Sequence, residues 1–120
     1  EPATLLYQVW SLTRTIDDAF KPDSGIALDQ LLAEADELIL DVVKVLEGEQ
    51  ETEIVRLLLH LRDALSRQSP GQPLSGTAEA ARAEVINLVN NFFYDKLTSM
   101  PSIKAYMDEI QGANLPAGKV

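Results

Sequence analysis

The chain contains one histidine, His60, and an imidazole is the side chain best suited to proton or phosphoryl transfer near neutral pH. It lies in a helical pattern in which Arg56, His60, Asp63 and Arg67 are four, three and four residues apart. This spacing places the four side chains on one polar face, so His60 is expected to be exposed between arginines. Such a face could hold an incoming phosphate and accept a phosphoryl group.

The residues around His60 weigh against that chemistry. Histidine phosphotransfer modules carry a pattern such as His-x-Leu-Lys-Gly, and residues 61–64 of this chain do not match it. An exposed histidine that pairs weakly with Asp63 is therefore the preferred interpretation. A phosphotransfer module that uses His60 as the phospho-acceptor is the alternative function.

Carboxylates are the other side chains that could carry chemistry, and they crowd one helical segment. Residues 27–47 include one base, Lys44, and six acids: Asp29, Glu34, Asp36, Glu37, Asp41 and Glu47. These acids lie opposite the apolar stripe, and no glutamate precedes His60 by three residues, as a di-iron bundle would require. The sequence also lacks calcium-loop spacing, a Gly-x-Ser-x-Gly motif and a phosphate-binding glycine loop. We expect no metal, no cofactor and no enzymatic activity, and interpret the acidic side as solvated or as a docking face for a basic partner.

Asn87, Asn90 and Asn91 stand within five positions of one helical segment, and Tyr94 follows them. Asparagine is unfavourable inside a helix because its side chain competes for backbone hydrogen bonds. Asn87, Asn91 and Tyr94 are four and three residues apart, so they share a face. That face is polar but uncharged, and interface cores are depleted in charge and enriched in aromatic residues. These four residues are candidate partner-binding residues. The alternative is that they hydrogen-bond to a neighbouring loop or to the last helix.

Three more residues occupy unexpected positions on their helices. Leu40 lies on the acidic side of its segment, and Arg62 lies inside an apolar arc. Leu59 lies about 160° around the helix from Leu57, because successive helical residues are separated by about 100°. Leu59 therefore either contacts something beyond the nearest helix or is exposed. We add Leu40, Leu59 and Arg62 to the candidate partner-binding residues, with a second copy of the chain as one partner.

Proline and glycine clusters separate segments with the helical period of 3.6 residues. Thr77 is expected to cap the fourth segment, and Gly48 and Gly112 to follow the second and the fifth. The predicted helices cover residues 3–20, 27–47, 52–68, 78–97 and 103–111. Short connections between long helices favour antiparallel neighbours. The sequence predicts an all-α fold over residues 1–112: an antiparallel up-down four-helix bundle with a short fifth C-terminal helix that caps one open end. Residues 113–120 are expected to form a flexible tail.

The composition is that of one globular domain. The 120 residues are 46% hydrophobic and 24% charged, and they include no cysteine. Nineteen acids against ten bases give a net charge of −9, which disfavours nucleic acid and anionic membranes as partners. No apolar run approaches the length of a membrane span. The composition favours the cytoplasm without fixing the compartment. We expect a non-enzymatic protein–protein interaction module, an adaptor, assembly factor or regulatory domain, whose partner is another protein or a second copy.

Overall fold

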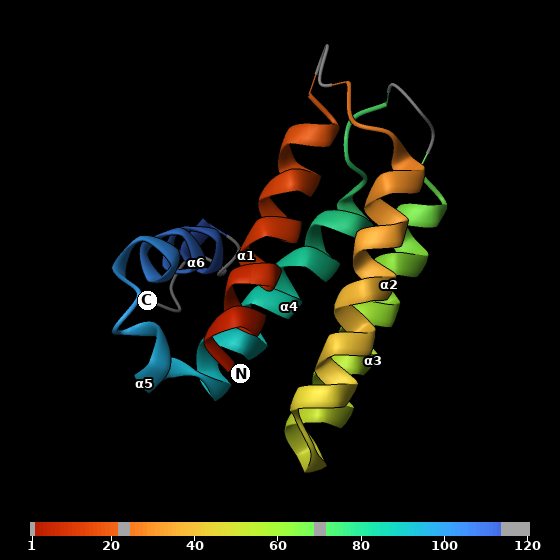
Figure 1. Ribbon diagram of the computed structural model, residues 1–120. Helices are drawn as coiled ribbons and strands as arrows, with labels where there is room; N and C mark the ends of the chain where they lie inside the picture. The colour runs from red at the N-terminus through yellow and green to blue at the C-terminus, as the bar shows by residue number, and fades with distance from the viewer. Residues whose placement is uncertain (1, 22–24, 69–71, 114–120) are drawn as a thin grey trace.

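The computed structural model describes residues 2–21, 25–68 and 72–113, which form helices and connections without a strand. The helices are α1 (Pro2–Ala19), α2 (Leu28–Val45), α3 (Gly48–Ser66), α4 (Gly76–Phe92), α5 (Tyr94–Leu97) and α6 (Pro101–Ala113). Helices α1 to α4 run alternately in opposite directions (Figure 1). The predicted all-α fold, an antiparallel four-helix bundle followed by a C-terminal helix, is confirmed.

The core forms because each long helix carries an apolar stripe that faces the others. Helix α3 packs against both α2 and α4, and α1 packs against α2. Burying each large aliphatic side chain contributes about 1.5–3 kcal/mol. The largest fully buried side chains are Leu6, Val9, Ile16, Leu31, Val42, Ile54, Leu58, Leu61, Leu65, Ile86, Leu97 and Met107.

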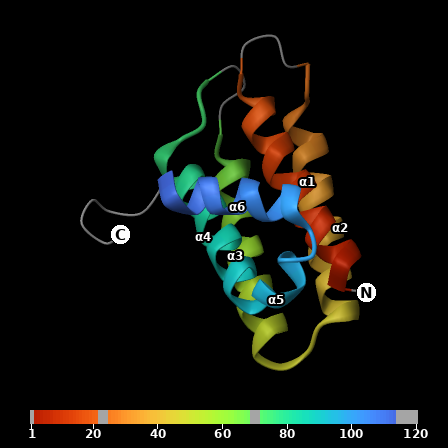
Figure 2. The same ribbon diagram turned by 90° about the vertical axis from the view of Figure 1, so that its left-hand side faces the viewer.

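Helix α6 covers a side of the bundle and does not cap an end, so that part of the prediction is wrong. It runs across α1 and α4, as Figure 2 shows, and packs mainly against α4. Ile103 and Met107 of α6 are buried in the common core. The α1–α4 side of the bundle is thereby covered. On the opposite side, no helix within the described ranges covers α2 and α3.

The α2–α3 connection is tighter than the sequence pattern predicts. Helix α2 ends at Val45, and α3 begins at Gly48, four residues before the predicted start. Gly48 has a φ of 67°, a left-handed conformation that favours glycine, so it reverses the chain here. Residues 49–51 contain no apolar side chain, so the apolar pattern did not include them. Their glutamates nonetheless favour a helix N-terminus.

The fourth predicted helix is interrupted before its end. Helix α4 stops at Phe92, and Phe93 has φ −119° and ψ 28°, outside helical geometry. Asn90 and Asn91, both poor helix formers, precede this break. The short helix α5 then redirects the chain, which lets Leu97 enter the core and α6 return to the bundle.

Two further boundaries differ from prediction. Ser75, and not Thr77, caps α4, because its hydroxyl accepts a hydrogen bond from the Ala78 amide at 3.1 Å. Helix α6 continues past Gly112 to Ala113. The predicted tail otherwise lies outside the described residues.

Candidate functional site

The exposed outer side of the α2–α3 hairpin carries an apolar surface, which we call the hairpin face. It consists of Asp36, Leu40 and Val43 on α2 and of Val55, Leu59 and Arg62 on α3. In each helix the three residues are spaced so that they lie along one line on the surface. Three of the residues that the sequence marked as unexpected, Leu40, Leu59 and Arg62, therefore belong to one surface.

The aliphatic side chains of the hairpin face are unusually exposed. Leu40 is 60% exposed, Val43 51% and Leu59 50%. Val55 is partly buried and packs against the core. Single exposed leucines are common, but apolar residues that adjoin across two helices mark contact surfaces more often.

Arg62 and Asp36 close one end of the hairpin face. Arg62 Nε lies 2.5 Å from Asp36 Oδ1, and Arg62 Nη2 lies 3.2 Å from Asp36 Oδ2, so the contact is bidentate. This hydrogen bonding raises the pKa of Arg62 above its ordinary value, and the guanidinium stays charged. The pair explains why an arginine lies in the apolar arc of α3, because its guanidinium reaches a carboxylate of α2.

The amphipathic pattern of both helices produces this surface. The buried residues of α2 are Leu31, Ala35, Leu38 and Val42, and Leu40 lies opposite them on the helix. The apolar residues of α3 extend beyond the core to Leu59. Each helix thus carries more apolar surface than the four-helix core uses.

His60 lies on α3 and is exposed, as predicted. Its neighbouring cations are engaged with acids of the same helix. Arg56 Nη2 lies 2.9 Å from Glu53 Oε2, and Arg67 Nε lies 3.3 Å from Asp63 Oδ2. The expected partner of His60, Asp63, is therefore paired with Arg67. These contacts reduce the cationic character that phosphate binding at His60 would require.

The asparagine group is divided by the fold. Asn87 and Asn91 are exposed on α4, whereas Asn90 is buried and its amide donates to Asp108 Oδ1 at 3.0 Å. Asn90 therefore does not belong to an open contact surface. Its role matches the alternative interpretation, a hydrogen bond to the last helix.

Tyr94 also lies close to α6. Lys104 Nζ stands 4.8 Å from the centre of the Tyr94 ring and 2.6 Å from Asp108 Oδ1. The hydrogen bonds from Lys104 and then from Asn90 lower the pKa of Asp108. Tyr94 is exposed, but one side of its ring is already occupied by a cation.

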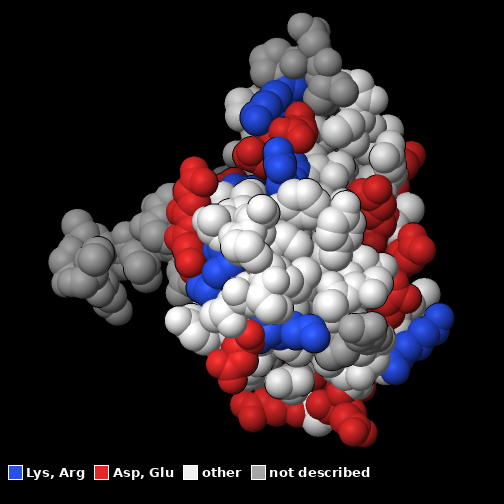
Figure 3. Space-filling view, turned by 60° about the vertical axis from the view of Figure 1, so that its left-hand side comes forward, with Lys and Arg blue, Asp and Glu red and all other residues white. Residues whose placement is uncertain are grey.

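Figure 3 shows a second area, on the α1–α6 side of the molecule, in which most side chains are uncharged, with Asp and Glu at its margins and several Lys and Arg side chains beside and within it. Tyr7 of α1 is exposed, and its ring centre lies 5.2 Å from that of Trp10, over which the Arg14 guanidinium lies at 5.3 Å. A shallow groove beside Tyr7 separates α1 from α2 and includes Glu34 and Glu37. Gln8, in this groove, donates to Asp41 Oδ2 at 2.7 Å.

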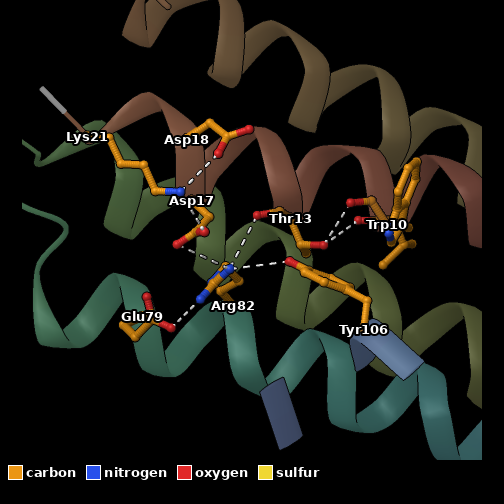
Figure 4. A network of polar contacts seen from close by, with 9 residues as sticks. Trp10, Thr13, Asp17, Asp18, Lys21, Glu79, Arg82 and Tyr106 are labelled. Atoms are coloured by element: carbon orange, nitrogen blue, oxygen red, sulfur yellow. Dashed lines mark hydrogen bonds and ion pairs between the residues drawn. The ribbon is translucent and has the colours of Figure 1, made fainter. Parts of the chain in front are cut away.

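Arg82 is a buried residue that the sequence reading did not identify. Its side chain is 4% exposed, and its guanidinium joins three helices (Figure 4). Nη1 donates to the Thr13 carbonyl at 3.4 Å and to the Tyr106 hydroxyl at 3.3 Å, and Nη2 donates to Glu79. These contacts fix α6 to α1 and α4. The sequence does contain a signal for this residue. Arg82 is four positions from both Ala78 and Ile86, so the helical period places it on the apolar stripe of α4.

Within the described ranges, no three carboxylate or imidazole side chains converge as a metal site would require. None of the helices in that part of the chain has both the length and the apolar character needed to cross a bilayer. Comparisons with protein-family models, with curated proteins and with solved structures found no match for this chain.

Proposed function

We propose that the chain is a non-enzymatic protein–protein interaction module and that the hairpin face is its contact surface. The observation that carries this proposal is the exposure of Leu40, Val43 and Leu59 on one side of the bundle. Removing such a surface from water is favourable, and the Arg62–Asp36 pair supplies a polar margin like that of known interfaces. An adaptor, assembly factor or regulatory domain would use such a surface.

The hairpin face supports this function better than the aromatic side of the molecule does. The rings of Trp10 and Tyr94 each have a cation from the same chain over them. A partner could stack on the occupied face of either ring only by displacing Arg14 or Lys104. The aliphatic side chains of the hairpin face require no displacement of a helix, because no helix in the described part of the chain covers them.

Site-directed photo-crosslinking tests the proposal. A photoreactive amino acid replaces Leu59 in one variant and Glu84, an exposed residue of α4, in a control variant. Both proteins are irradiated in an extract of the source cells and, separately, as pure proteins. We expect position 59 to give a discrete product, with this chain or with another protein, and position 84 to give none.

A second substitution on the same face makes the test specific. The product from position 59 should be lost when Leu40 is changed to Asp, because Leu40 lies on the other helix of the face. Equal yields from positions 59 and 84, or a yield at 59 that is indifferent to Leu40→Asp, would contradict the proposal.

A further inference from the structure

We propose that the occupant of the hairpin face is a second copy of this chain, held in a two-fold dimer whose axis runs along the α2–α3 hairpin. This inference rests on the proposed function, because it names the partner of the same surface. In the dimer, α2 of each copy lies over α3 of the other. The two α2–α3 hairpins, one from each copy, thus pack together as four helices across the interface.

The alignment of α2 and α3 carries the inference. The helices are antiparallel, and we infer their alignment from the Arg62–Asp36 contact, whose two side chains meet at one height along the hairpin. Val43 follows Asp36 by seven residues and Val55 precedes Arg62 by seven, so these two valines are level. Leu40 follows Asp36 by four residues and Leu59 precedes Arg62 by three, so these two leucines are almost level.

A two-fold axis along the hairpin exchanges the positions of α2 and α3 without changing their heights. Asp36 of one copy then faces Arg62 of the other, and this contact occurs twice. Leu40 faces Leu59 of the second copy, and Val43 faces its Val55. The surface is therefore complementary to itself in both charge and apolar character, as an isologous interface requires.

The charge distribution permits this association despite the net charge of −9. Asp36 lies between the acids Glu34 and Glu37 on α2, whereas the C-terminal half of α3 carries the cation Arg62 beside a single acid, Asp63. Crossing α2 over α3 brings Asp36 of each copy to Arg62 of the other. Opposite potentials across an interface favour this arrangement over like-charged ones.

The size of the hairpin face predicts a weak dimer. Helices of 18 and 19 residues are each about 27 Å long, and two side by side are about 20 Å wide with their side chains. Each copy therefore contributes a face of about 500 Å², near the lower limit for a specific interface. We expect a dissociation constant in the micromolar range.

Sedimentation equilibrium of the pure protein and of two charge-reversal variants tests the dimer. The wild type should be dimeric at high micromolar concentration. Asp36→Arg and Arg62→Asp should each weaken self-association at least tenfold, because like charges then face each other across the axis. An equimolar mixture of these two variants should restore it as a heterodimer, because each altered residue then meets an opposite charge.

Apolar variants provide the matched controls. Leu59→Glu should weaken self-association at least 100-fold, whereas Tyr7→Glu, which changes an equally exposed residue on another side, should not. Circular dichroism verifies that each variant is folded. A wild type that stays monomeric up to about 1 mM, or single variants that do not combine as heterodimers, would overturn the dimer.

Different results would contradict the homodimer and the interaction module. If the pure chain is monomeric but position 59 crosslinks another protein in a Leu40-dependent manner, the dimer is wrong and the interaction module stands. If the chain is monomeric and position 59 yields no product, both are wrong.

Discussion

Arg62 of α3 forms a bidentate ion pair with Asp36 of α2, and this pair borders the exposed side chains of Leu40 and Leu59. The contact joins the two helices and forms the polar margin of the face. An arginine in an apolar arc and a leucine on an acidic side are thus two parts of one surface.

Adjacent leucines of α3 should respond very differently to truncation. Leu58 is 1% exposed and Leu59 is 50% exposed. Leu58→Ala should lower the free energy of unfolding by about 2–5 kcal/mol, because it leaves a cavity in the core. Leu59→Ala should change it by less than about 1 kcal/mol when measured by urea denaturation at a concentration where the protein is monomeric. Equal costs for the two variants would show that Leu59 is part of the core.

The sequence was sufficient to predict the helices and the antiparallel bundle, because their apolar stripes are long and regular. It also marked Leu40, Leu59 and Arg62 individually. It could not place them side by side, since their proximity depends on how the turn at Gly48 aligns α2 with α3. The break at Phe93 was missed because the apolar period continues through it to Leu97.

The buried contacts of Arg82 could not be predicted from the sequence for a related reason. Its partners Thr13 and Tyr106 lie 69 and 24 residues away in the chain, so only the folded structure brings them together. The Asn90–Asp108 contact likewise depends on α6 crossing α4. Polar contacts between distant segments leave no local pattern that a single sequence reveals.

The free energy of unfolding should fall more when Glu79 loses its charge than when the charged side chain of Arg82 is replaced. Glu79→Gln removes the nearer of two carboxylates from the buried guanidinium, leaving Asp17 Oδ1 at 4.0 Å from Nη1, and should cost about 1–2 kcal/mol of unfolding free energy. Arg82→Met retains most of the packing and removes the buried charge, so it should cost less. Urea denaturation of both variants at pH 7 measures the difference. A larger cost for Arg82→Met would mean that the hydrogen bonds to Thr13 and Tyr106 dominate.

The stability contributed by Asp108 should depend on pH. Hydrogen bonds from Lys104 and then from Asn90 lower the pKa of Asp108 in the folded protein. The stabilisation is therefore complete at a pH above 3.8, the ordinary pKa of the group, and it is lost as the pH falls through the lowered pKa of the folded state. Because the carboxylate is half exposed, the effect should not exceed about 1 kcal/mol. Wild type and Asp108→Asn should therefore differ in unfolding free energy at pH 7 and converge near pH 2. A difference that persists at low pH would exclude the charge as its origin.

His60→Gln should leave the native mass of the protein and its unfolding free energy unchanged within about 0.5 kcal/mol, because the side chain is exposed. Incubation with the small phosphodonor acetyl phosphate should yield no acid-labile phosphate on the wild type. Acid-labile phosphate that disappears in His60→Gln would instead support the phosphotransfer function.

The size of the tagged protein in an extract of its source cells tests most directly whether the hairpin face is an interface. The wild type should elute well above the 13.2 kDa of a single chain, and Leu59→Glu should elute as a folded monomer. With the tagged protein added to the extract at high micromolar concentration, this comparison detects both a second copy and a different protein. Wild type and Leu59→Glu eluting at the same size, whether as monomers or as complexes, would contradict the account.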